Sequence, residues 1–76
     1  MATLAELRLG EAALVAQVHG ADEISLRLLE MGLTPGVGVR LLAVAPLGDP
    51  LEIELRGYRL SVRRSEAERI ELQPVA

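Results

Sequence analysis

The sequence predicts a mainly β fold, a small five-stranded barrel with one short α-helix between the first and second strands. Three observations support this prediction. Apolar and polar residues alternate in the second half of the chain, which is typical of strands. Only residues 23–31 combine a capping residue with apolar residues at helical spacing. The chain has 76 residues and no cysteine, so we expect a single domain over residues 1–76 that is held by packing alone.

The first third of the chain predicts a short turn, a strand and a helix. Residues 3–9 form a single turn before Gly10, and the nearly continuous apolar residues 12–18 form the first strand, which ends at His19. Asp22 is expected to cap a helix over 23–31, because its carboxylate can accept hydrogen bonds from the first free backbone N–H groups.

A sharp corner is expected between this helix and the second strand. Gly32 can adopt the left-handed conformation that closes a helix, and Leu33 can then fold back onto the last turn. Pro35 and Gly36 suit a turn in which a fixed negative φ is followed by a positive one. Since geometry explains them, Gly32 and Gly36 are predicted to be structural residues.

The second half of the chain predicts the other four strands. Residues 37–45 form the second strand, and a loop over 46–50 follows, with Gly48 as a turn residue. Residues 51–56 and 59–64 form a hairpin whose two loop residues are Gly57 and Tyr58 in a type II′ turn. This register places Ile53 opposite Val62. Ser65 is expected to cap one short turn before a closing strand over 70–72.

The helix has more leucines than one face can bury. Ile24, Leu28 and Met31 form one stripe for the core, and Leu26, Leu29 and Leu33 form a second stripe. Two interpretations remain open, since the helix can be sunk more deeply between strands or the second stripe can be an exposed binding surface. On the second interpretation, the candidate partner-binding residues are Leu26, Leu29, Leu33, Pro35 and Leu47.

Composition argues against a nucleic-acid reader and against a membrane-spanning protein. The net charge is -3 and Tyr58 is the sole aromatic residue, whereas nucleic-acid readers combine a basic groove with aromatic platforms. No apolar run reaches the length of a membrane span and no leader pattern is present, so we expect a cytoplasmic protein.

Neither a catalytic nor a metal site is predicted. His19 is the single histidine, and a ferrous or zinc site generally needs several converging ligands. Glu52 and Glu54 share a strand face, but Arg63 opposite Glu52 indicates a charge-balanced sheet exterior. The serines have no plausible base except His19. We therefore predict a non-enzyme without a cofactor.

The chain resembles a known family along nearly its whole length, from about Leu4 to Leu72. The motifs that carry this resemblance are, in order, L-x-x-x-G-L-T-P-G-V, A-P-L-G-D-P, G-Y-R-L-S-V-R-R and E-A-E-R-I-E-L. Their order and spacing are similar to those of the FeoA family of small proteins associated with bacterial ferrous iron uptake. The resemblance implies a Src-homology-3-like barrel.

The resemblance also implies a partner, FeoB, which is a ferrous iron transporter of the membrane with a cytosolic GTPase domain. The chain would then be a regulatory accessory protein, which contacts the membrane only through this partner. Related barrels occur as C-terminal domains of iron-dependent repressors, so a metal-binding or peptide-binding interaction domain is the alternative. Self-association through the same leucines is a further alternative to binding of FeoB. An Arg of the hairpin, among Arg56, Arg59, Arg63 and Arg64, is a weaker candidate for contact with the partner's nucleotide.

Overall fold

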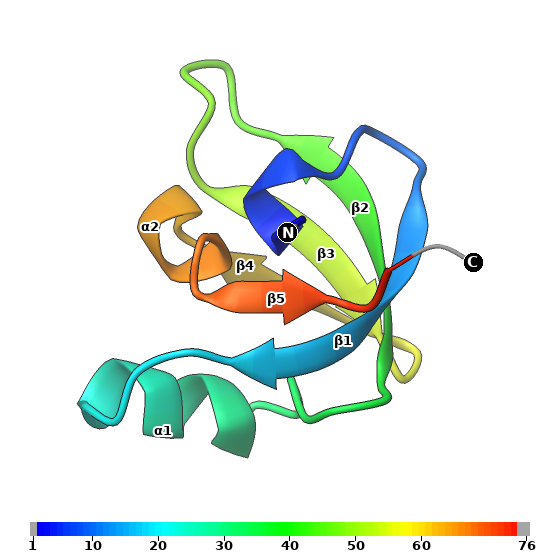
Figure 1. Ribbon diagram of the computed structural model, residues 1–76. Helices are drawn as coiled ribbons and strands as arrows, with labels where there is room; N and C mark the ends of the chain where they lie inside the picture. Colours follow the sequence, from blue (N-terminus) through cyan, green and yellow to red (C-terminus); the bar gives the residue numbers. More distant parts are fainter. Residues whose placement is uncertain (1, 75–76) are drawn as a thin grey trace.

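The computed structural model describes residues 2–74 and confirms a mainly β fold with one α-helix between the first two strands. Its elements are β1 (Ala12–Val18), α1 (Glu23–Glu30), β2 (Gly38–Val44), β3 (Leu51–Leu55), β4 (Tyr58–Val62), α2 (Arg64–Ala67) and β5 (Ile70–Leu72). The strands form one antiparallel sheet in the order β4-β3-β2-β1-β5 (Figure 1). Within residues 2–74, β4 and β5 do not pair, so the small barrel stays unclosed. The outermost residues of the predicted domain, 1 and 75–76, lie outside the described residues.

One hydrophobic core lies inside the curled sheet, and every strand contributes to it. Successive side chains of a strand point to opposite faces, so in β3 the three apolar residues point inward while Glu52 and Glu54 point outward. The sheet must curve around these side chains because all five strands contribute to a single cluster. The buried apolar residues are Leu4, Val15, Leu28, Leu33, Val37, Val39, Leu41, Leu51, Ile53, Leu55, Val62, Ala67, Ile70 and Leu72.

The hairpin of β3 and β4 forms, but its turn lies one residue earlier than predicted. Leu55 pairs with Tyr58, so the two loop residues are Arg56 and Gly57. Their φ angles of +50° and +82° are those of a type I′ turn, whose twist matches that of the flanking strands. The predicted register is therefore wrong, and Ile53 lies opposite Leu60. The same faces still point inward, because each partner changes by two positions.

The N-terminal segment and α2 complete the fold. The N-terminal segment contains a short 3-10 helix (Leu4–Glu6) and lies along the outer edge of β5, where the Leu72 N–H donates to the Ala2 carbonyl at 2.9 Å. Near the other end, α2 begins after Arg63 and not after Ser65 as predicted. The Glu66 carboxylate accepts from the Arg63 N–H at 2.9 Å and so sets this start.

Candidate functional site

A polar network fixes the start of α1, which lies at one end of the barrel (Figure 1). Asp22 caps the helix as predicted and accepts from the Ser25 N–H at 3.1 Å. The Ser25 hydroxyl donates to the His19 carbonyl at 2.7 Å, which accounts for its burial inside an amphipathic helix. Arg69 donates to the Asp22 carboxylate at 2.6 Å. This bond and the Ser25 N–H lower the pKa of Asp22 to about 2.

The corner at the end of α1 has the predicted geometry. Gly32 has a φ of +105°, and its N–H donates to the Leu29 carbonyl at 3.0 Å while the Leu33 N–H donates to the Leu28 carbonyl at 3.2 Å. These two bonds define a Schellman motif, in which the residue after the glycine packs on the last turn of the helix. The Tyr58 hydroxyl, which comes from β4, donates to the Met31 carbonyl. The end of α1 is therefore tied to the hairpin.

The same motif corrects the predicted binding surface. Leu33 folds back into the core and is fully buried, so the prediction that it belongs to an exposed stripe is wrong. Leu26 is 58% exposed and Leu29 is half-buried, so only these two residues of that stripe reach the surface. In the predicted core stripe, Ile24 is exposed because α1 is rotated to bury Leu28 and Leu33.

The other two candidate partner-binding residues, Leu47 and Pro35, lie in different parts of the fold. Leu47 is 96% exposed in the loop between β2 and β3, and Figure 1 shows this loop and α1 at opposite ends of the molecule. Leu47 therefore does not share a surface with the helix leucines, although the sequence placed it among the same candidate partner-binding residues. Pro35 is exposed in the turn after α1, where the Val37 N–H donates to the Thr34 carbonyl at 3.1 Å. Gly36 supplies the positive φ that a type II turn needs at this position.

The exposed part of α1 borders a shallow hollow of about 330 Å³. We call Leu26, Leu29 and this hollow the α1 surface. Leu26 and Leu29 supply its apolar side, and the polar network of Asp22 and Ser25 lies beside it. The second stripe is therefore divided, because Leu33 at the end of the helix is buried in the core whereas Leu26 at its middle is exposed. The lining residues are Gly20, Ala21, Asp22, Glu23, Ser25, Leu26 and Leu29.

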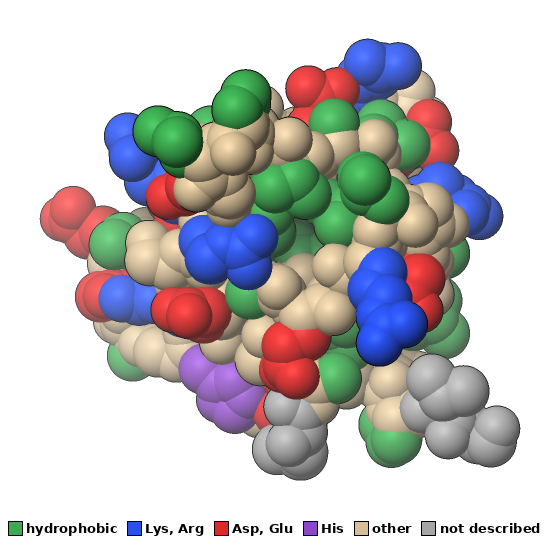
Figure 2. Space-filling view, turned by 90° about the horizontal axis from the view of Figure 1, so that it is seen from above, with side chains coloured by type: hydrophobic (Ala, Val, Ile, Leu, Met, Phe, Trp, Pro, Cys, Tyr) green, Lys and Arg blue, Asp and Glu red, His purple; other side chains and the backbone are tan. Residues whose placement is uncertain are grey.

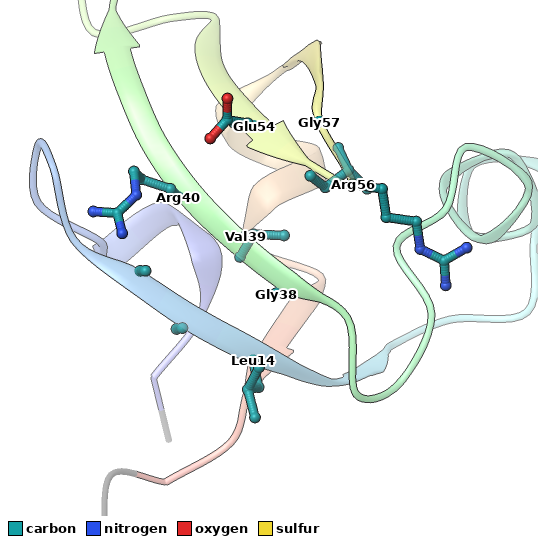
Figure 3. Close-up of a pocket in the computed structure, with 10 residues that line it drawn as sticks. Leu14, Gly38, Val39, Arg40, Glu54, Arg56 and Gly57 are labelled. Atoms are coloured by element: carbon teal, nitrogen blue, oxygen red, sulfur yellow. The ribbon is translucent and has the colours of Figure 1, made fainter.

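A second and larger hollow, of about 490 Å³, lies on the outer face of β1, β2 and the end of β3. Gly38 pairs with Leu14 and has no side chain, which leaves a gap in this face. Arg40 and Arg56 lie on opposite sides of the hollow (Figure 3), and the Arg40 guanidinium donates to the Gly10 carbonyl at 2.5 Å. This hollow was not predicted from the sequence, although a glycine inside a strand can indicate a gap on a sheet face.

Acidic and basic side chains are mixed over the surface. Figure 2 shows them interspersed around apolar side chains on one face, without a broad area of one sign. In the hairpin region, Arg59 pairs with Glu52 at 3.0 Å, where Arg63 was expected, and Arg64 donates to backbone carbonyls. Arg56 and Arg63 make no ion pair with any described residue.

Residues 2–74 contain no group of three or more His, Asp or Glu side chains that could hold a metal ion. His19 contacts Glu71, with 2.6 Å between Nε2 and Oε1, and its ring also lies 3.3 Å from the Gln17 amide. His19 therefore has polar partners at the end of β1. Among the described residues, no helix is long and apolar enough to cross a membrane.

Comparison with known proteins identifies the family. Residues 2–74 match the family model of the FeoA domain. The chain belongs to the FeoA family. A curated relative from Porphyromonas gingivalis, an Fe(2+) transport protein A/Fe(2+) transporter FeoB fusion protein, is 34% identical over 73 residues. That match covers 96% of this chain and 9% of the relative, so the chain spans under a tenth of the fusion protein's length.

Solved FeoA structures share the fold. FeoA of Stenotrophomonas maltophilia complexed with zinc, described as a procaryotic SH3 domain protein, is 38% identical with a TM-score of 0.85, covering 96% of this chain and 91% of that one. FeoA from Chlorobium tepidum is 39% identical with a TM-score of 0.88, covering 99% and 71%. A manganese-dependent transcriptional repressor is 19% identical with a TM-score of 0.85, covering 95% and 35%, which shows a shared fold alone.

Proposed function

We propose that this FeoA-family protein is a non-enzymatic accessory protein of ferrous iron uptake that binds the cytosolic GTPase region of a FeoB-type transporter. The P. gingivalis relative carries this proposal, because its name joins FeoA and FeoB in one fusion protein. Fusing two parts that bind each other raises their effective concentration, so a weak contact suffices. In this proposal the contact forms in the cytoplasm, and the protein reaches the membrane only through its partner.

We place the contact at the α1 surface, with Pro35 as a neighbouring exposed residue of the turn that follows. Leu26 supports this placement because it is an exposed apolar side chain beside a shallow hollow. Protein interfaces depend on a few apolar anchors that become fully buried on binding. Leu26 can serve as such an anchor, and Leu29 forms the half-buried base on which a partner side chain would pack.

The test measures binding of the purified chain to the cytosolic GTPase region of a FeoB-type transporter by calorimetry, with GDP and with a GTP analogue. Leu26→Asp should weaken binding by about thirtyfold or more, because loss of an interface anchor removes at least about 2 kcal/mol. Leu47→Asp is the matched control, since it changes an exposed leucine at the far end and should leave binding unchanged.

Three results count against the proposal. Absence of binding in every nucleotide state refutes the partner, and equal effects of Leu26→Asp and Leu47→Asp refute the α1 surface. The third result is a dimer of the free chain in sedimentation that Leu26→Asp dissociates. It would mean that a second copy of the chain covers these leucines.

A further inference from the structure

The two outer strands of the sheet differ in how their free edges are covered. The edge of β5 is occupied by the N-terminal segment, through the bond from the Leu72 N–H to Ala2 and a bridge between Thr3 and Glu71. Among residues 2–74, β4 pairs only with β3, so its other side has no strand. Exposed strand edges display unpaired backbone groups that can template another strand.

The pairing register identifies the free backbone groups of β4. In a hairpin with a two-residue loop, the residues that flank the loop exchange both hydrogen bonds, and hydrogen-bonded pairs then alternate along the strands. Here the flanking pair is Leu55 and Tyr58, so the N–H and C=O groups of Arg59 and Ser61 point away from β3. Among residues 2–74, no backbone hydrogen bond to these outward groups is found outside the strand pairing.

Space and exposure favour an added strand at this edge. Arg59 and Ser61 are both exposed, and a hollow of about 340 Å³ lies beside Ser61 between β4 and the helices, where Arg27 and Glu66 contribute to its lining. Leu60, on the inner face of β4, is only half-buried. An incoming strand with apolar side chains on its inner face would therefore extend the core over Leu60.

Charge determines which strand fits. Residues 56–64 include four arginines and no acidic residue, and of these only Arg59 has an ion-pair partner among the described residues. The Arg64 side chain donates to backbone carbonyls, whereas Arg56 and Arg63 flank β4 at its two ends. A second copy paired about Ser61 in antiparallel register would place Arg59 opposite Arg63, and like charges directly opposite are destabilising. An acidic strand avoids this repulsion.

We infer that the free edge of β4 binds an extended acidic segment of a partner protein as an added strand. Backbone groups of Arg59 and Ser61 pair with the segment, and acidic side chains on its outer face lie near Arg59 and Arg63. The apolar side chains on its inner face cover Leu60. This site is separate from the α1 surface, so each can be abolished without loss of the other.

The probe is an end-capped octapeptide of alternating Val and Glu, titrated into the full chain by NMR. Binding should perturb and protect the amides of Arg59 and Ser61 more than those elsewhere in the sheet. Ser61→Pro removes one edge N–H without removing a bond to β3, and it should weaken binding by about tenfold or more. Ser61→Ala keeps the N–H and is the matched control, which should bind as the unsubstituted chain does.

Two further peptides leave the protein unchanged, so they decide the question even where Ser61→Pro does not fold. One has N-methyl groups on its valines and the other on its glutamates. In an added strand only one of these sets faces β4, so one peptide should lose binding and the other should keep it. Three results would each overturn the inference. The parent peptide does not bind, or a Val–Lys peptide binds equally well. The third is equal binding of both N-methylated peptides, which indicates a general attraction between charges.

Discussion

Substitution of Gly32 tests how the corner after α1 is held. In Gly32→Ala, the new Cβ would lie 2.9 Å from the Tyr58 hydroxyl oxygen and 3.3 Å from Leu55 Cδ1, at a φ of +105°. The φ alone costs about 1–2 kcal/mol for a residue with a side chain. Displacing the Tyr58 hydroxyl from the Met31 carbonyl removes a hydrogen bond worth about 1 kcal/mol.

The expected loss in the free energy of unfolding is therefore about 2–3 kcal/mol. A chain of 76 residues has a total stability of about 4–11 kcal/mol, so this loss is a large share of it. For a domain of this size each kcal/mol lowers Tm by about 4–8 °C. Gly32→Ala should thus melt at least about 8 °C below the unsubstituted chain.

Gly36→Ala is the matched control, because Gly36 has a φ of +90° with no atom within 4 Å of the added Cβ. It should lose only the backbone part, about 1–2 kcal/mol. In a Tyr58→Phe background the close contact with the hydroxyl is absent, so Gly32→Ala should then approach the effect of Gly36→Ala. Urea unfolding and thermal melting followed by circular dichroism measure all five proteins. If Gly32→Ala and Gly36→Ala lower the free energy of unfolding equally in the chain that keeps Tyr58, the proposed contact between the Gly32→Ala side chain and the Tyr58 hydroxyl is refuted.

Two other predictions concern the core and the start of α1. Leu33→Ala should lower the free energy of unfolding by about 3 kcal/mol because it opens a cavity in the core. Leu26→Ala changes an exposed residue and should alter that free energy by less than about 0.5 kcal/mol. Comparable losses in thermal melts would contradict the burial of Leu33. The pKa of Asp22 is about 2 in the folded protein against an ordinary 3.8, so its ionised form contributes stability that is present above pH 3.8 and lost as the pH falls toward 2. Asp22→Asn keeps the helix cap without the charge. The difference in the free energy of unfolding between the unsubstituted chain and Asp22→Asn, measured by urea titration, should therefore narrow as the pH falls from 3.8 toward 2. A difference that does not change with pH would contradict the pairing of Asp22 with Arg69.

Local patterns in the sequence determined most of the fold. Asp22 caps a helix, Gly32 ends it and alternation marks the strands, because each of these depends on the φ angles and hydrogen bonds of a few neighbouring residues. The hairpin turn was the exception, since Arg56 adopts a positive φ that only pairing along the whole of β3 and β4 holds in place.

The candidate surfaces were decided by tertiary structure. The sequence shows that α1 has surplus leucines, but the rotation of the helix depends on remote contacts, the Tyr58 hydroxyl on Met31 and the ion pair of Arg27 with Glu66. With the helix held in this way, Leu28 and the folded-back Leu33 are buried, and Leu26 remains exposed. The coverage of the sheet edges likewise depends on segments far apart in the chain, because the N-terminal segment pairs with β5. A sequence pattern specifies which side chains are apolar, whereas packing between distant segments determines which of them remain available to a partner.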